Sequence, residues 1–189
     1  PDGLDLFPGQ RQLVARQPYD LPGAQPWLGS YALQTDWYTT MEGGLGFFSC
    51  AVPEEFGGSG MGFSESVLMA EQIARVSASW RLPFNMQNLG PALTVCRFGT
   101  QAQKEKYVPG WVAGTQLGFF AMTEPNTGSD VASMRTYAVD KGDHWEVHGG
   151  KIWISQAHVG DAGLLYAYTD RAAGNKGMTA FIIEPKNMP

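Results

Sequence analysis

The sequence has 189 residues, 43% of them hydrophobic, which is enough to bury one sizeable core or two small ones and excludes a wholly disordered chain. The net charge of -5 comes without a run of Lys or Arg, so the basic stripe typical of nucleic-acid binding is excluded. We therefore expect the partner to be a small molecule or another protein.

The first part of the chain predicts little regular structure. Residues 1–43 are rich in Pro, Gly, Gln and Tyr and show neither helical nor strand periodicity. Residues 44–60 combine a short apolar run with a Pro and a glycine-rich turn, which predicts a connector between helices. The start at Pro1, in place of Met, indicates an incomplete or processed chain.

Two amphipathic helices are predicted next. Residues 62–80 carry apolar or small side chains at three- and four-residue intervals, typical of a helix with one apolar face. These side chains are Phe63, Val67, Ala70, Ile73, Ala74 and Ser77. Residues 89–98 repeat the pattern, and Gly99 supplies a stop.

A third helix is predicted from its start signal. Thr100 and Gln103 have the spacing of a capping box, in which each side chain bonds to the backbone of the other residue. Pro109 and Gly110 follow Val108, so we expect this helix to end near Val108.

The sequence changes character at Gly118. Short runs rich in aromatic and β-branched residues are separated by turn-forming clusters, which predicts an antiparallel sheet. The runs are GFFAMT, SMRTYAV, HWEVH, KIWIS, GLLYAYT and MTAFIIE. Gly149 and Gly150 should form the turn of a hairpin between HWEVH and KIWIS.

These elements predict an α+β protein with a helical domain at 1–117 and a β-domain at 118–189. A doubly wound nucleotide-binding fold is disfavoured because strands and helices do not alternate and no Gly-x-Gly-x-x-Gly fingerprint is present.

The residues that usually bind metals do not form a recognisable site. Cys50 and Cys96 lie far apart without a Cys-x-x-Cys spacing, which indicates two reduced, buried thiols. His144, His148 and His158 lack companion ligands, so surface or packing roles are expected. No apolar run approaches the length needed to span a membrane, and the N-terminus lacks the basic stretch and apolar core of a targeting sequence.

The most specific stretch is AMTEPNTGSD at 121–130, a turn that presents several small polar groups after a strand. Such a turn can offer hydroxyls and backbone N–H groups to an anionic or heteroaromatic ligand. From chemistry alone, an ordinary β-turn with local side-chain hydrogen bonds is an equal alternative. The segment resembles the signature of the acyl-CoA dehydrogenase family.

A second motif lies downstream, KIWISQA at 151–157. An indole can lie flat on a flavin ring, and a hydroxyl nearby can donate to a flavin heteroatom, although a lone Trp in a strand is usually a core residue. The motif is similar to the Trp-Ile-Thr/Ser segment that the family carries at this distance. Gln156 stands where the family usually has Asn.

The resemblance extends over residues 44–189 and includes the EQIAR, FGTQAQKEKYVP and AFIIEP segments. It implies a helical N-terminal domain, an antiparallel β-barrel-like middle domain, and a C-terminal four-helix domain that is absent from this chain. Residues 1–43 do not resemble the long amphipathic helices with which the family begins.

The resemblance also implies FAD as the cofactor and assigns the residues that would bind it. Phe120, Met122, Thr123 and Ser129 would line the flavin pyrimidine and pyrophosphate, with Gly128 in the same turn. Three residues would cover the isoalloxazine ring: Trp153, Ile154 and Ser155. Ser129 would also touch the CoA thioester, and no metal site is implied.

Arg81 follows Trp80 at the end of the helix predicted to contain EQIAR. A helix-terminal Arg often satisfies exposed carbonyls, but this context resembles glutaryl-CoA dehydrogenases, where the arginine binds the distal carboxylate of the acyl chain. A guanidinium can pair with a carboxylate through two hydrogen bonds and so select dicarboxylic acyl chains. The sequence from TYAVDKGDHWEVHGGKIWIS through YAYTDRAAGNKGMTAFIIEP resembles the anaerobic type of glutaryl-CoA dehydrogenase, which oxidises its substrate without decarboxylation.

In this family a carboxylate removes the α-proton of the thioester while the β-hydrogen leaves as hydride to the flavin. The resemblance implies that the base is a glutamate beyond Pro189, so no catalytic residue is expected within the chain. Glu124 belongs to the flavin-binding turn, and Asp130 should brace that turn.

Several functions stay open at this point. The leading one is dehydrogenation of glutaryl-CoA or a similar dicarboxylyl-CoA, with electrons passed to an electron-transferring flavoprotein. The alternatives are a dehydrogenase of another carboxylated or cyclic acyl-CoA such as benzylsuccinyl-CoA, an oxidase or monooxygenase on the same scaffold, and a non-catalytic flavin- or acyl-CoA-binding module. The family implies a homotetramer, located in the cytoplasm of a bacterium or in the mitochondrial matrix of a eukaryote.

Overall fold

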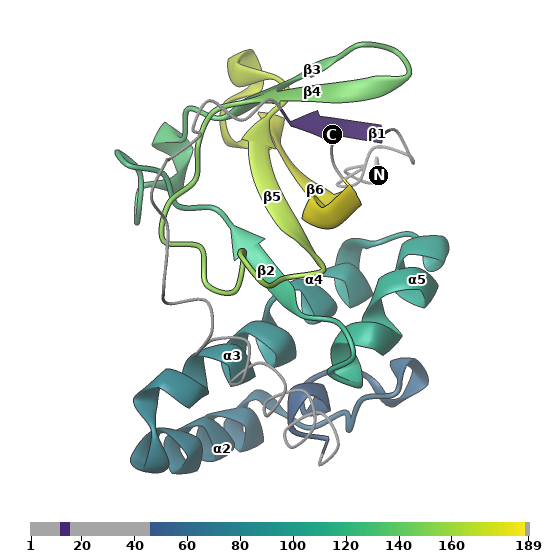
Figure 1. Cartoon of the computed structure of the whole chain (residues 1–189), viewed down its shortest axis with the longest axis vertical. Helices are drawn as coiled ribbons and strands as arrows, with labels where there is room; N and C mark the ends of the chain where they lie inside the picture. The colour runs from purple at the N-terminus through teal and green to yellow at the C-terminus, as the bar shows by residue number, and fades with distance from the viewer. Residues whose placement is uncertain (1–11, 16–45, 188–189) are drawn as a thin grey trace.

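The computed structural model describes residues 12–15 and 46–187. A helical part comes before a part built on a sheet, which confirms the predicted α+β class (Figure 1). The helices and strands are β1 (Gln12–Ala15), α2 (Phe63–Val76), α3 (Ala78–Leu89), α4 (Pro91–Phe98), α5 (Gln101–Val112), β2 (Gly118–Ala121), β3 (Tyr137–Asp140), β4 (His144–His148), β5 (Ala162–Tyr168) and β6 (Met178–Ile183). Most of residues 1–43, for which the sequence predicts no regular structure, lie outside the described ranges.

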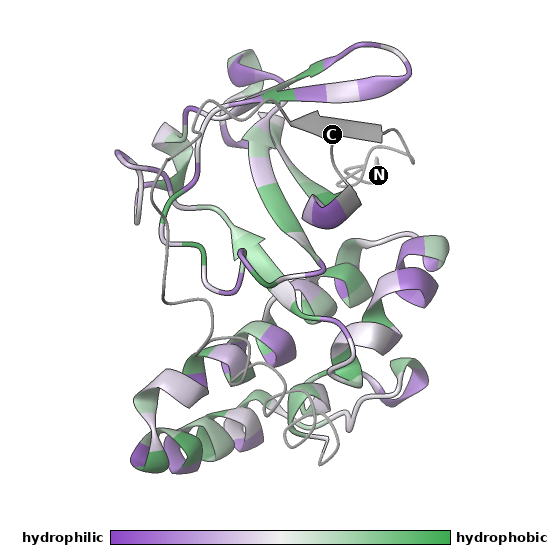
Figure 2. Cartoon of the chain, in the orientation of Figure 1, coloured by the Kyte–Doolittle hydropathy of each residue, from purple (hydrophilic) through white to green (hydrophobic). Residues whose placement is uncertain are grey.

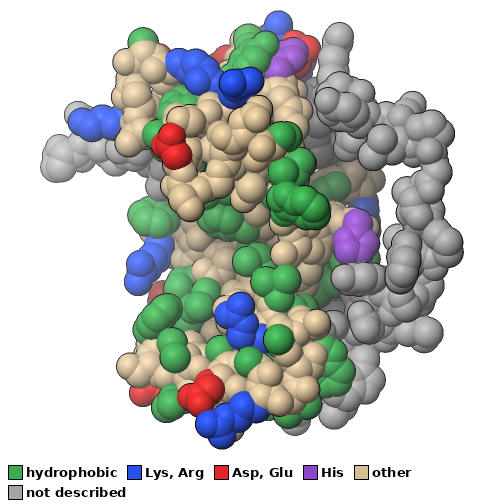
Figure 3. Space-filling view, turned by 90° about the vertical axis from the view of Figure 1, so that its left-hand side faces the viewer, with side chains coloured by type: hydrophobic (Ala, Val, Ile, Leu, Met, Phe, Trp, Pro, Cys, Tyr) green, Lys and Arg blue, Asp and Glu red, His purple; other side chains and the backbone are tan. Residues whose placement is uncertain are grey.

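The helix predicted at 62–80 is in fact two helices. Ser77 has an extended backbone, so α2 ends at Val76 and α3 begins at Ala78. The apolar face predicted for α2 is not buried by the described residues, because Phe63 and Val67 are 69% and 50% exposed. The space-filling view shows hydrophobic side chains at the surface of the helical part (Figure 3).

The next two helices follow their sequence signals only in part. Leu89 closes α3, and Gly90 separates it from α4, so the helix predicted from residue 89 starts two residues later, with a proline in its first turn. The capping box is confirmed: Gln103 N donates to Thr100 Oγ1 (3.3 Å) and Thr100 N donates to Gln103 Oε1 (2.8 Å).

The predicted end of the third helix at Val108 is wrong. α5 continues through Pro109 to Val112. Proline removes one helical hydrogen bond, but the following turn carries Trp111, which is completely buried in the core. Packing of this turn therefore offsets the lost hydrogen bond.

The sheet is mixed, so the prediction of a wholly antiparallel sheet is wrong. Its strands lie in the order β1-β4-β3-β5-β2, with β6 on β5. The pairs β1–β4, β2–β5 and β3–β5 are parallel, whereas β3–β4 and β5–β6 are antiparallel. Among the described strands the sheet does not close, so the barrel-like form is not seen. The 40-residue excursion between β2 and β5 is long enough to allow parallel pairing.

The predicted hairpin between HWEVH and KIWIS is also wrong. HWEVH is β4, but it pairs with β3 through a turn at Gly142, whose φ is 95°. KIWIS is not a strand, because Trp153 has a φ of 58° and the Ile152 N–H bonds to Thr123 O. The tertiary contact replaces the ladder that its strand propensity predicts.

Two hydrophobic clusters hold the described parts together. The first joins α4 and α5 to β5 and β6, and the second lies among the strands. Figure 2 shows β2 and β5, which run from the helices into the sheet, mainly in hydrophobic colours. Cys50 and Cys96 are both buried and unbridged as expected, and burial raises the pKa of the Cys96 thiol to about 11.

A buried amide fixes the start of β2 against the helices. Gln87, in the last turn of α3, accepts a hydrogen bond from Gly118 N (2.6 Å) and donates to the carbonyls of Gln116 (2.9 Å) and Trp111 (3.3 Å). The side chain is completely buried and all its polar groups are satisfied. It therefore sets the position of the strand that leads into the candidate site.

No helix in the two described ranges combines the length and apolar character needed to cross a bilayer.

Candidate cofactor site

The site begins where β2 ends, at Ala121. Glu124 and Thr127 exchange backbone hydrogen bonds of 2.9 and 3.1 Å, which closes a tight turn with Pro125 and Asn126 exposed at its tip. The stretch AMTEPNTGSD therefore forms the turn that its composition predicts.

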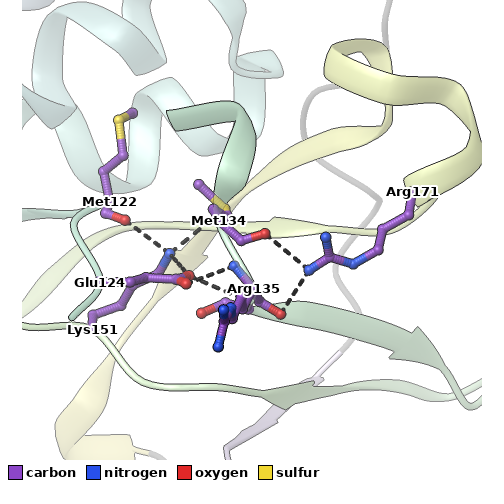
Figure 4. A network of polar contacts seen from close by, with 7 residues as sticks. Met122, Glu124, Met134, Arg135, Lys151 and Arg171 are labelled. Carbon is purple, nitrogen blue, oxygen red and sulfur yellow. Dashed lines mark hydrogen bonds and ion pairs between the residues drawn. The ribbon is translucent and has the colours of Figure 1, made fainter. Parts of the chain in front are cut away.

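A buried ion pair lies beneath this turn. Glu124 and Lys151 have side chains that are 5% and 8% exposed, and Lys151 Nζ lies 2.8 Å from Glu124 Oε1. The carboxylate also accepts the backbone N–H groups of Arg135 (2.6 Å) and Thr136 (3.0 Å) (Figure 4). Lys151 donates in addition to the carbonyl of Met122 (3.0 Å).

Burial acts on both charges of this pair. It raises the pKa of Glu124, but the hydrogen bonds from Lys151, Thr136 and Arg135 outweigh it and bring that pKa down to about 2. The pKa of Lys151 is lowered, because for the ammonium burial outweighs the bond to Glu124. The shift of Glu124 favours its ionised form, whereas the shift of Lys151 favours its neutral form. The satisfied geometry of the carboxylate supports a Glu124 that stays ionised at neutral pH.

The second motif lies directly beside the first. Ile152 N donates to Thr123 O at 3.0 Å, so residues 151 and 152 are bonded to residues 122, 123 and 124. Ile154 packs against the hydrophobic cluster of the strands and anchors the loop. The structure therefore brings together the backbones of the two motifs that the sequence singles out.

The loop that carries the second motif is strained. Among the described residues, only Trp153 and Gln156 combine a side chain with a positive φ, 58° and 66°. The indole of Trp153 is 86% exposed, so burial of the indole does not offset the strain. A strained, exposed aromatic beside a polar turn is typical of a ligand-binding loop.

The predicted cofactor-binding residues lie on these two segments and on β2. Phe120 and Met122 are half-buried, and Phe120 packs on Tyr166 with ring centroids 4.8 Å apart. The hydroxyls of three further residues make no hydrogen bond within the described part of the chain: Thr123, Ser129 and Ser155. Convergence of these side chains on one ligand stays a prediction.

Two buried polar atoms in the same segments have no partner among the described residues. They are Thr127 Oγ1, in the turn, and Gln156 Oε1, in the loop. A buried polar atom without a hydrogen bond is costly, so such atoms mark places where a ligand or water completes the structure. Gln156 is also the residue at which the second motif departs from the family pattern.

Arg81 lies on a different element from the one predicted. The EQIAR helix ends at Val76, and Arg81 is in the first turn of α3, where its backbone N–H bonds to Ser77 O (3.3 Å). It is therefore not a residue of the last turn of α2. The residue is half-buried, and α3 contacts β2 through Gln87 near its other end.

Sequence reasoning missed two residues that position this site, Lys151 and Gln87. Lys151 opens both the predicted strand and the second motif, but the sequence assigns it no role, because a lysine ahead of an apolar run is ordinary until its burial is known. Gln87 carries no local signal, because an amide in a helix is ordinary until its burial is known.

Known proteins are similar to this chain in sequence and in fold. The chain is 49% identical over 149 residues to a glutaryl-CoA dehydrogenase of Desulfococcus multivorans and 42% identical over 149 residues to the mitochondrial isovaleryl-CoA dehydrogenase of Pongo abelii. Each match covers 78% of this chain, and 38% and 35% of those proteins. A solved structure described as the glutaryl-coenzyme A dehydrogenase glutaryl-CoA complex aligns with 90% of this chain and 49% of its own, at 38% identity and a TM-score of 0.75.

The chain thus spans about a third to a half of the length of these relatives. The models of the N-terminal and middle domains of acyl-CoA dehydrogenases match residues 19–115 and 119–189. Together with the α+β fold and the paired motifs, these matches establish that the chain belongs to the acyl-CoA dehydrogenase family.

Proposed function

We propose that the protein containing this chain is an FAD-dependent oxidoreductase that dehydrogenates an acyl-CoA thioester between its α- and β-carbons. The observation that supports this most is the bonding of residues 151 and 152 to residues 122, 123 and 124, which joins the two family motifs. We further propose glutaryl-CoA or a similar dicarboxylyl-CoA as the substrate.

The residues of the site fit FAD. The hydroxyls of Thr123, Ser129, Ser155 and Thr127 have no hydrogen-bond partner among the residues that the structure describes, and they are suited to a cofactor rich in heteroatoms. Phe120, Met122, Trp153 and Ile154 would supply apolar and aromatic surface, and Gly128 leaves open space beside the turn. When bound, FAD supplies the acceptor for the hydride that leaves the β-carbon.

Glu124 does not serve as the base in this proposal. Its carboxylate is buried, it accepts three hydrogen bonds, and its pKa of about 2 makes it a weak proton acceptor. Asp130 accepts a hydrogen bond from the Ser133 hydroxyl at the start of the next turn, which is a bracing contact. We propose that a glutamate outside residues 1–189 removes the α-proton.

Arg81 is the proposed determinant of substrate choice. Its guanidinium would bind the distal carboxylate of the acyl chain with two charge-assisted hydrogen bonds. The helix that carries it is held against β2 by Gln87, so the arginine has a fixed position relative to the strand that bears Phe120. We further propose that the protein passes its electrons to an electron-transferring flavoprotein and assembles as a homotetramer. Its location would be the bacterial cytoplasm or the mitochondrial matrix, and its helical and β-domains would divide at residues 117/118.

The test uses the complete protein, purified with FAD and assayed with an artificial electron acceptor. Turnover of glutaryl-CoA should exceed turnover of butyryl-CoA, and the Arg81→Ala variant should lose roughly 100-fold in kcat/KM for glutaryl-CoA while keeping its activity on butyryl-CoA. Formation of glutaconyl-CoA or crotonyl-CoA distinguishes oxidation alone from oxidation with decarboxylation.

Arg97→Ala is the matched control, because Arg97 is an exposed arginine in the last turn of α4. Its kinetic constants should equal those of the unmodified protein. Unchanged turnover of glutaryl-CoA by Arg81→Ala would contradict the dicarboxylate proposal, and a complete protein that does not bind FAD would contradict the proposed function itself.

A further inference from the structure

The ion pair between Glu124 and Lys151 differs from the other ion pairs among the described residues. Both of its side chains are at most 8% exposed, whereas every other pair has at least one partner that is 25% exposed or more. Replacing a buried pair of this kind with apolar groups is often neutral or stabilising, because desolvation costs as much as the attraction returns. Stability alone therefore does not explain the pair.

The contacts of Lys151 show what the pair fixes. Its ammonium group donates to the Met122 carbonyl and the Glu124 carboxylate, and it lies 3.6 Å from the sulfur of Met134. The next residue, Ile152, bonds to the Thr123 carbonyl between them. Two consecutive residues of the loop thus bind three consecutive residues of the turn.

Glu124 extends the connection to a third segment. Oε2 accepts the Arg135 N–H and Oε1 accepts the Thr136 N–H, just ahead of β3. Arg171 donates to the carbonyls of Met134 and Arg135 from the other side (Figure 4). The turn, the loop and the entry to β3 therefore share one polar network with the ion pair at its centre.

We propose that Lys151 and Glu124 are a positioning pair that holds the turn carrying Thr123 and the loop carrying Trp153 at the separation required to bind FAD. The inference rests on the proposed function. The contacts of the Lys151 ammonium and of both Glu124 oxygens form without a ligand, so the two segments are placed before the cofactor binds, and neither side chain needs to touch it. Preorganisation of this kind lowers the cost of binding.

A lysine suits this role because its compact ammonium has three donors that can point in different directions. Here it reaches a carbonyl, a carboxylate and a sulfur that come from three different residues. A methionine at this position keeps most of the aliphatic stem and removes the donors. Lys151→Met therefore isolates the polar contacts.

The experiment compares Lys151→Met, the double variant Glu124→Gln/Lys151→Met, and the control Lys106→Met in the complete protein. Lys106 also pairs with a glutamate, Glu184, at 2.6 Å, but its side chain is 56% exposed and lies on α5. The double variant leaves no unpaired charge in the interior, so it keeps the comparison usable if Lys151→Met alone does not fold. Three quantities are measured: the thermal midpoint, the Kd for FAD, and hydrogen exchange of the Ile152 amide in the FAD-free protein.

The expected result is a double variant that still folds with a cooperative thermal transition. Its Kd for FAD should be roughly 10-fold higher or more, and its Ile152 amide should exchange roughly 10-fold faster or more. Lys106→Met should change neither the Kd nor the exchange rate. A double variant with unchanged Kd, or with a Kd that rises only as far as in Lys106→Met, would overturn the inference.

The two failures can be told apart. If the unmodified protein does not bind FAD, the proposed function is wrong, and the exchange of the Ile152 amide still decides whether the pair holds the segments together. If the unmodified protein binds FAD and the exchange of Ile152 is the same in the double variant, the positioning role is wrong while the proposed function stands.

Discussion

Acidification should selectively weaken the network around Glu124. The pKa of this carboxylate is about 2 in the folded protein and 4.5 as its ordinary value in an unfolded chain. A group whose pKa is lowered by folding stabilises the folded state above its unfolded pKa, and this stabilisation is lost as the pH falls toward its folded pKa. The relevant window therefore runs from about pH 5 down to about pH 2.

The size of the effect follows from the same shift. One pKa unit corresponds to about 1.4 kcal/mol, so Glu124 contributes about 3 kcal/mol to the free energy of unfolding at about pH 6 and about 1 kcal/mol at about pH 3. Lys151 adds no slope in this range, because it is protonated in both states. Its pKa is lowered by burial, so the pH dependence that it adds to stability is confined to alkaline pH.

The assay is urea-induced unfolding of the FAD-free complete protein at about pH 6 and about pH 3, for the unmodified sequence and for Glu124→Gln/Lys151→Met. The other carboxylates titrate alike in both proteins, so the difference between the two free energies of unfolding isolates the pair. From about pH 6 to about pH 3, the unmodified protein should lose about 2 kcal/mol more free energy of unfolding than the double variant does. A difference that stays constant to within about 0.5 kcal/mol would refute the assignment of an ionised, hydrogen-bonded Glu124.

Two further substitutions test other parts of the structure. Gln87→Leu leaves the buried Gly118 N–H without an acceptor and should lower the free energy of unfolding by about 2 to 4 kcal/mol in urea titrations; a loss below about 1 kcal/mol would contradict the role of this amide. Trp153→Gly keeps the left-handed backbone angle but removes the side chain for which this angle costs roughly 1 to 2 kcal/mol. The FAD-free protein should therefore not lose stability while the Kd for FAD, followed by flavin fluorescence, rises; a clear loss of stability would identify the indole as a core residue.

The parts of the fold that local chemistry determines were predictable from the sequence. The capping box of Thr100 and Gln103 and the break at Gly99 appear as expected, and so do five of the six predicted strands, all but KIWIS. The failures arise where tertiary packing overrides local preference. α5 continues past Pro109 because Trp111 is buried, and the parallel pairing of β2 with β5 joins segments 40 residues apart, which no local pattern encodes.

The candidate site shows the same division. The turn at 121–130 was predictable because Pro, Asn and Gly specify turns locally, and the family motif identified the loop at 151–157. Its backbone was not predictable, because Ile152 and Trp153 favour a strand by composition. Their actual conformation depends on the Thr123 carbonyl, which lies 29 residues earlier in the chain.

The misassigned strand and the buried ion pair have one physical origin. A strand at 151–155 would bond to β4, the sheet neighbour expected for it, and the Lys151 ammonium would then have no reason to be buried. In the observed loop, Lys151 and Ile152 bond to the turn, while Trp153 takes a positive φ and leaves its indole 86% exposed. The energy of the buried network therefore maintains a strained, exposed aromatic beside the turn, an arrangement that strand pairing would abolish and that a planar cofactor can use.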